Sequence, residues 1–122
     1  MKRLLPLLFL ASFGLAQVQI QIQVPPPPVI TVSTEVRVSL VPSLVVIERE
    51  PQPQGIVVVY RSSRAYDVYR YHHRDLVGRG WVRVKYQGRG GFYKSEYRRG
   101  RAKAKLEVRD RRGRVEVKVR EG

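Results

Sequence analysis

The chain has 122 residues, with 24 Lys and Arg against 10 Asp and Glu, which gives a formal net charge of +14 at neutral pH. It contains no cysteine, which excludes disulfide bonds, thiolate metal ligands and a lipidated N-terminal cysteine. Sequence motifs of nucleotide-binding loops, serine hydrolases and zinc proteases are also absent from it. We therefore predict that the protein is not an enzyme and uses no metal or cofactor.

The first sixteen residues have the pattern of a secretory signal peptide. Lys2 and Arg3 form a short basic region, residues 4–15 are mostly apolar, and Gly14 and Ala16 place small residues at positions −3 and −1 of a cleavage site. The apolar run is short for a membrane span. We predict cleavage after Ala16 and a periplasmic or secreted location, with an uncleaved N-terminal anchor as the alternative.

Residues 17–28 combine an alternating segment with a proline run. Every second residue of Gln17–Val24 is Val or Ile and the others are Gln, so we predict a strand whose uncharged edge can pair with another chain. Pro25–Pro28 predicts a stiff extended spacer of about 3.1 Å per residue. We treat 17–28 as an N-terminal strand and spacer, and 29–122 as a basic β domain.

Alternating apolar and polar residues predict strands through most of this domain. We expect one strand over 29–41, and two strands buried on both faces at 44–47 and 56–60, separated by a turn at 48–55. The predicted fold is all-β, a small antiparallel barrel or sandwich of about seven or eight short strands with little helix.

The C-terminal part of the chain gives the most specific local pattern, a β-hairpin. Two alternating stretches flank residues 110–113, which predict a four-residue loop. We expect Val108 opposite Val115 and Leu106 opposite Val117, because this register keeps the apolar side chains on one face. The same register places like charges opposite one another on the other face, which is unfavourable.

The positive charge is concentrated in the second half of the chain. Residues 61–122 hold 20 basic and 7 acidic residues, a balance of +13, whereas residues 17–60 hold Arg37 and Arg49 against three glutamates, a balance of −1. Such an asymmetry indicates an anionic partner for the second half.

Aromatic residues are interleaved with the basic residues of this half and can provide a stacking platform. We expect Tyr86 on one side of a strand at 81–86, and Trp81 and Arg83 on the other. The residues predicted to bind the anionic partner are Arg70, Arg83, Lys85, Arg89, Arg98 and Arg99, and the predicted stacking residues are Tyr69, Trp81 and Tyr93.

Two further patterns have competing interpretations. The Arg-Gly-Gly unit in Gly88–Phe92 and the looser copy in Gly78–Trp81 are typical of nucleic-acid-binding repeats, but we favour glycines at turns. His72 and His73 would point to opposite faces of a strand, which suits no metal, so we expect exposed loop histidines. A ribonuclease-like pairing of one of them with Glu96 or a lysine, on an RNA bound by the arginines, is a minor alternative.

The residues that carry a family resemblance are the proline run, the segment Tyr66–Tyr69, Gly80-Trp81 and Phe92-Tyr93. Through them the chain resembles small exported, proline-rich bacterial envelope proteins of unknown function. In those proteins, tyrosine pairs surround Gly-x-Trp units. The resemblance covers about residues 24–97 of this chain. It implies a periplasmic or envelope location and no known activity.

Two functional hypotheses follow. The first is a non-enzymatic envelope or extracellular protein that binds an anionic polymer through an Arg/Tyr surface: cell-wall polysaccharide, the lipid headgroups of a membrane surface, or extracellular nucleic acid. The alternative is a structural subunit that assembles into a homo-oligomer through the edge of its N-terminal strand.

Overall fold

The computed structural model describes residues 27–122, so the predictions for the signal peptide, the N-terminal strand and the first two prolines lie outside the described residues. The described part contains strands and one helix. They are β2 (Val29–Thr31), β3 (Arg37–Ser39), β4 (Val46–Gln52), β5 (Gly55–Arg61), α1 (Ala65–Gly78), β6 (Val82–Arg89), β7 (Phe92–Arg99), β8 (Ala102–Asp110) and β9 (Arg114–Glu121).

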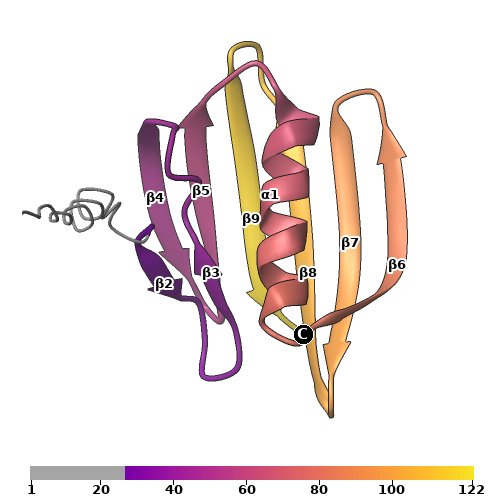
Figure 1. Ribbon diagram of the computed structural model, residues 1–122. Coiled ribbons are helices and arrows are strands. Elements are labelled where there is room, and N and C mark those ends of the chain that lie inside the picture. The colour runs from indigo at the N-terminus through magenta and orange to yellow at the C-terminus, as the bar shows by residue number, and fades with distance from the viewer. Residues whose placement is uncertain (1–26) are drawn as a thin grey trace, which may run out of the picture.

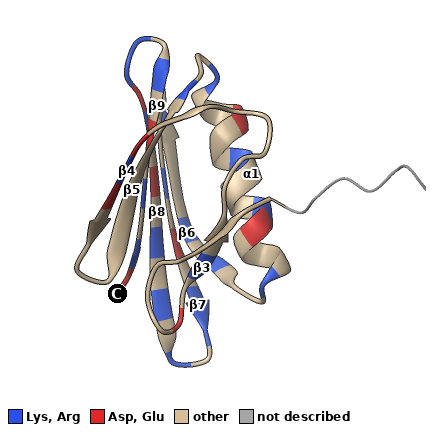
Figure 2. Ribbon diagram, turned by 90° about the vertical axis from the view of Figure 1, so that its left-hand side faces the viewer, with Lys and Arg blue, Asp and Glu red and all other residues tan. Residues whose placement is uncertain are grey.

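Six strands form one sheet in the order β4-β5-β9-β8-β7-β6, and all neighbours are antiparallel. Strands β2 and β3 form a separate hairpin, which lies with α1 over one face of the sheet (Figure 1). Figure 2 shows the sheet nearly edge-on with α1 on one side only. We call the uncovered side the open face. The predicted antiparallel β fold with a C-terminal hairpin is confirmed, although the sheet of the described residues does not close into a barrel.

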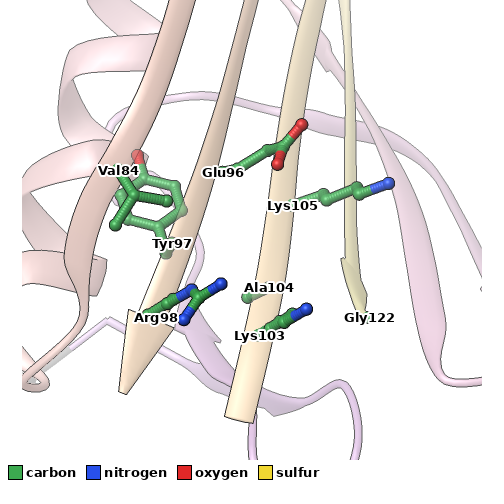
Figure 3. Close-up of a pocket in the computed structure, with 8 residues that line it drawn as sticks. All are labelled: Val84, Glu96, Tyr97, Arg98, Lys103, Ala104, Lys105 and Gly122. Atoms are coloured by element: carbon green, nitrogen blue, oxygen red, sulfur yellow. The ribbon is translucent and has the colours of Figure 1, made fainter. Parts of the chain in front are cut away.

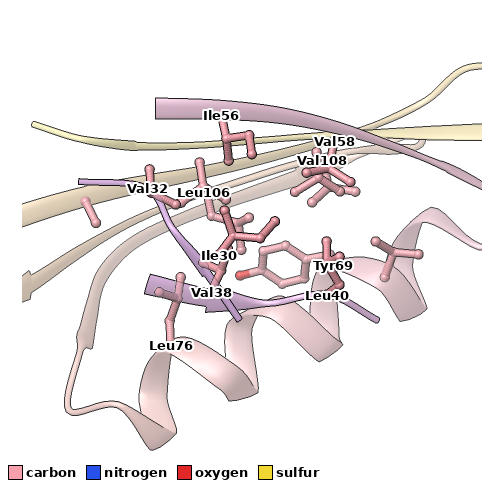
Figure 4. Packing of buried hydrophobic residues seen from close by; sticks show 14 of the residues in the cluster. Ile30, Val32, Val38, Leu40, Ile56, Val58, Tyr69, Leu76, Leu106 and Val108 are labelled. Carbon is pink, nitrogen blue, oxygen red and sulfur yellow. The ribbon is translucent and has the colours of Figure 1, made fainter. Parts of the chain in front are cut away.

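The hydrophobic core lies between the sheet and the layer made of α1 and the β2–β3 hairpin. Alternate residues of the sheet point into it, because successive side chains of a strand face opposite sides. Figure 4 shows Ile56, Val58 and Leu106 from the sheet meeting Val38 from the hairpin and Leu76 from the helix. Each fully buried residue of this size contributes about 1.5–3 kcal/mol through the hydrophobic effect.

The helix α1 is the main element that the sequence analysis missed. Its buried residues have helical spacing, since Ala65, Val68, Tyr69, His72 and Leu76 recur at intervals of three or four. The many Tyr and Val residues favour strands when taken singly, but packing against the sheet decides the outcome. The helix ends at Gly78, and the chain then turns through Gly80, whose φ is +95°.

The predicted strand at 29–41 is wrong because the chain reverses in its middle. The Ser33 hydroxyl accepts hydrogen bonds from the backbone N–H groups of Glu35 and Val36, at 3.3 and 3.2 Å, and this local bonding competes with an extended strand. The result is the β2–β3 hairpin, in which Ile30 is paired with Val38.

The predicted turn at 48–55 is also too long. Most of it belongs to β4, and the turn is limited to Pro53 and Gln54, with Gln54 at a φ of +56°. Strand β5 is buried on both faces, as expected, but β4 is not, because it forms one edge of the sheet. Its Pro51 fits this place, since proline is tolerated on edge strands.

The register of the C-terminal hairpin differs by two residues from the expected one. Val108 pairs with Val117 and Leu106 pairs with Val119, and the loop contains only residues 111–113. A shift of two leaves every side chain on the same face, so the apolar pattern alone cannot detect it. The observed register replaces the expected like-charge pairs with Glu107 opposite Lys118 and Arg109 opposite Glu116.

Candidate anion-binding surface

The open face carries most of the charged residues of β7, β8 and β9, because these residues alternate with the core residues along the three strands. Basic residues outnumber acidic ones on this face. Following the register, its cations are Arg61, Lys85, Arg89, Lys94, Arg98, Lys103, Lys105, Arg109, Arg114, Lys118 and Arg120, and its carboxylates are Glu48, Glu50, Glu96, Glu107 and Glu116.

Charges in the middle of the open face alternate in sign across the strands. Glu107 on β8 lies between Lys94 on β7 and Lys118 on β9. Opposite charges that face each other directly across strands stabilise a sheet by roughly 0.2–1 kcal/mol a pair. This region is therefore close to electrically balanced.

The end of the open face where β7 finishes and β8 begins has a different pattern. Arg98 lies directly opposite Lys103, and Lys105 lies directly opposite Arg120. We call this group, together with Lys85 on the neighbouring β6, the basic corner: Lys85, Arg98, Lys103, Lys105 and Arg120. Glu96, which pairs with both Lys85 and Lys105, is the carboxylate among them.

A shallow hollow of about 90 Å³ lies in the basic corner. Figure 3 shows Arg98, Lys103 and Lys105 around it, with Glu96 on the adjacent strand and Val84 at its side. Cationic side chains from β7 and β8 thus border one concave spot, which suits a negatively charged group.

The cations of the basic corner have no ion-pair partner among residues 27–122. The ion pairs found there join Arg64 to Asp67, Arg79 to Asp75, Arg99 to Glu35 and Arg111 to Glu116. The side chains of Lys85, Arg98, Lys103 and Arg120 are exposed and that of Lys105 is partly buried. Their charge is therefore available to an external anion.

The structure divides the predicted anion-binding residues among several places. Lys85 and Arg98 belong to the basic corner. Arg89 lies at the other end of the open face, opposite Phe92, and Arg70 is exposed on α1. Arg83 and Arg99 are on the side of the sheet that α1 covers, so the six residues do not form one site.

Arg99 has a structural role. Its guanidinium donates hydrogen bonds to the backbone carbonyls of Arg79 and Glu35, at 3.0 and 2.7 Å, and lies 4.6 Å from the ring centre of Trp81. These contacts join the helix C-terminus, the β2–β3 turn and β7. An anion would have to displace them to bind this group.

Two of the three predicted stacking residues are buried, which corrects that expectation. Trp81 is 1% exposed and Tyr69 is 2% exposed, so neither offers a ring face to a ligand. Trp81 packs beneath Arg99, and the Tyr69 hydroxyl bonds to Ser95 and accepts a hydrogen bond from Arg83 at 2.9 Å. Tyr93, the third, is partly buried beside Tyr66, with ring centres 5.3 Å apart.

A register shift in β6 corrects the expected sides of strand 81–86. The irregularity lies between Arg83 and Lys85 and brings Arg83 to the same face as Tyr86, with the guanidinium 4.8 Å from the ring centre. Tyr86 is partly exposed on the side that α1 covers. Tyr86 and the basic corner therefore lie on opposite faces of the sheet.

The two histidines lie on α1 and not in a loop, contrary to expectation. His72 is buried and its Nε2 is 2.9 Å from the Tyr60 hydroxyl; burial lowers the pKa of His72 to about 4. His73 Nδ1 is 2.8 Å from the Tyr97 hydroxyl, and burial also lowers the pKa of His73. Glu96 lies on the open face, on the other side of the sheet, so the pairing of a histidine with Glu96 is wrong.

The glycine-rich units are turns, in agreement with the favoured interpretation. Gly90 and Gly91 form the two-residue turn between β6 and β7, with φ values of +51° and +84°. Both central positions of this turn have positive φ, a conformation that glycine adopts without strain. These residues are needed for the fold, which removes the main argument for a nucleic-acid-binding repeat.

Sequence reasoning missed Lys103, Lys105 and Arg120 as members of one site. Each was visible as a basic residue on the outer face of a predicted strand, but their grouping depends on the register and on the neighbouring β7 and β6. With the register known, the like-charge pairs Arg98–Lys103 and Lys105–Arg120 would have identified these residues as one group.

Residues 27–122 contain no cluster of His, Asp and Glu that could hold a metal ion, and their one helix is too short and too polar to cross a membrane. Comparison of the chain with known protein families, with curated proteins and with solved structures gives no match.

Proposed function

We propose that this protein is a non-enzymatic, exported module that binds an anionic polymer through the basic corner of its open sheet face. The observation that supports it most is the pair of like-charge contacts, Arg98 opposite Lys103 and Lys105 opposite Arg120. Each such pair destabilises the free protein by a few tenths of a kcal/mol. An anionic ligand that lies across both pairs converts this repulsion into attraction.

The shape of the surface favours an extended ligand over a small one. The hollow is shallow, and the cations come from β6, β7, β8 and β9, which span three strand spacings, or about 14 Å. A polymer with repeated negative groups can contact several of these cations at once. Cell-wall polysaccharide, anionic lipid headgroups and nucleic acid share this chemistry.

A sedimentation assay tests the proposal. The protein is mixed with peptidoglycan, with vesicles of anionic and of neutral lipid, and with DNA, each at low and at high salt. We expect binding to the anionic probes that is lost at high salt, because exposed charges are screened over about 10 Å at 0.1 M salt. Equal binding to neutral and anionic vesicles, or binding to none of the probes, contradicts the proposal.

A further inference from the structure

Strand β6 forms an unprotected edge of the large sheet. Among residues 27–122 it pairs with β7 alone, and all eight of its residues are exposed. Val82 and Val84 on this edge are 62% and 55% exposed. An edge of this kind offers unpaired backbone groups to a further strand.

The register shows which backbone groups of β6 are free. Arg89 and Phe92 flank the two-residue turn Gly90–Gly91, so they form the hydrogen-bonded pair that closes the hairpin. Such pairs alternate along an antiparallel ladder, so Gly88 and Tyr86 direct their N–H and C=O groups away from β7. The irregularity at Arg83/Lys85 is confined to the other end, which leaves a regular edge from Lys85 to Arg89.

We propose that the segment Gln17–Val24 of a second copy of this chain adds to β6 as a further strand. The segment has eight residues, the same number as β6, and alternates perfectly between apolar residues and glutamine. It carries no charge. The cations Arg83, Lys85 and Arg89 oppose the pairing of one β6 with another, but they do not oppose an uncharged strand.

The donor segment comes from another copy because its own chain cannot reach β6. The described chain begins beside β2, which lies on the β4 side of the sheet, whereas β6 forms the opposite edge (Figure 1). Five strand spacings separate these edges, or about 24 Å, whereas Pro25–Pro28 in an extended conformation spans about 12 Å.

The nearer edge, β4, is a poorer acceptor for the segment. Pro51 lacks a backbone N–H group, so this edge offers one donor fewer to a further strand. A donor that enters from the β2 end of the described chain and an acceptor at β6 give a head-to-tail contact, which extends as an open chain unless the rotation between copies closes a ring. The expected product is an open chain of subunits, which also multiplies the basic corners available to one polymer.

Light scattering after size-exclusion chromatography tests the assembly, using the chain without residues 1–16. We expect masses that are multiples of the monomer and that increase with concentration. The double substitution Ile20→Lys and Ile22→Lys should give a monomer, while the control Gln19→Glu and Gln21→Glu places carboxylates beside the cations of β6 and should retain assembly. A wild-type chain that is monomeric at all concentrations overturns the proposal.

Crosslinking identifies the acceptor edge, because the natural chain has no cysteine. A chain with Gln21→Cys and Gln87→Cys, treated with a short bismaleimide, should give a ladder of covalent oligomers. A chain with Gln21→Cys and Gln52→Cys, which labels β4, should not. An intramolecular product from the β4 variant, without a ladder from the β6 variant, overturns the proposal. The monomeric variant should still bind anionic vesicles, so this test is independent of the proposed polymer binding.

Discussion

Arg98 and Lys103 lie directly opposite each other on neighbouring strands, and both side chains are exposed on the open face. A few residues away, Lys94 and Lys118 each face Glu107. The same sheet thus contains one region in which opposite charges face each other and one in which like charges face each other. This contrast provides matched pairs of substitutions that separate binding from folding.

Lys103→Glu should stabilise the protein and weaken polymer binding at the same time. The substitution replaces repulsion with Arg98 by attraction, which we expect to raise the free energy of unfolding by about 0.5 kcal/mol. For a domain of this size that corresponds to an increase in Tm of roughly 2–4 °C.

The control for this experiment is Lys118→Glu, which places two carboxylates opposite each other at Glu107. It should lower Tm by a similar amount. Thermal unfolding followed by circular dichroism measures both variants. A Lys103→Glu variant that is less stable than the natural chain would show that the pair with Arg98 is not repulsive in the folded protein.

Asp75 should be the most important carboxylate for stability. It accepts hydrogen bonds from the Ser39 backbone N–H at 2.7 Å, from the Ser39 hydroxyl at 3.1 Å and from Arg79 at 3.1 Å, and so ties α1 to β3. Asp75→Ala leaves these donors without their acceptor, and we expect a loss of about 2–3 kcal/mol.

Asp67→Ala is the matched control on the same helix, because Asp67 forms an exposed ion pair with Arg64 at 3.4 Å. Exposed pairs contribute little, so the loss should be below about 1 kcal/mol. Urea unfolding measures both. Equal losses for the two variants would contradict the structural role of Asp75.

Stability should fall as the pH decreases from about 6.5 to about 4, and His72 should cause much of this fall. Its pKa is lower in the folded protein than in the unfolded chain because it is buried, so the unfolded chain binds the proton first within this range. The lowered pKa of His72 corresponds to a loss of about 3 kcal/mol in the free energy of unfolding once the pH has fallen to that pKa. His72→Gln should show a weaker pH dependence in urea unfolding between pH 7 and pH 4.5, and an unchanged dependence would rule out this origin.

Trp81 should report on the fold and not on ligand binding. It is the single tryptophan of the chain, and it is buried beneath Arg99. We expect blue-shifted emission, weak quenching by acrylamide, and no change when DNA or anionic vesicles are added at low salt. Strong quenching on polymer binding would instead support the original prediction that this ring stacks on the ligand.

Alternation along single strands was enough to predict the antiparallel fold and the last hairpin, because a period of two is a local property. It was not enough to predict register, since the pairing of Val108 with Val117 differs from the expected one by a shift that preserves both faces. The helix was hidden because Tyr and Val favour strands, while the spacing of its buried residues matters only once a sheet is present to cover.

Only some members of the candidate site were identified from the sequence. Charge asymmetry indicated an anionic partner, and Lys85 and Arg98 were among the residues named. The other members depend on which strands are neighbours in the sheet, a long-range property that the sequence of one strand does not contain. Tyr69 and Trp81 were wrongly expected to be exposed. Amphipathic rings of this kind occur both in cores and on surfaces, so the sequence alone does not show that these two are buried.

The most direct test of the account is the salt dependence of binding to a short DNA duplex, used as a polyanion of known charge density. If all five cations of the basic corner each replace a counterion, the slope of log affinity against log salt should be about −4.5. The double substitution Arg98→Gln and Lys103→Gln should reduce the magnitude of this slope by about 2, whereas Lys94→Gln and Lys118→Gln should change it much less. Equal effects of the two double substitutions, or a slope near zero for the natural chain, would contradict the basic corner as the binding site.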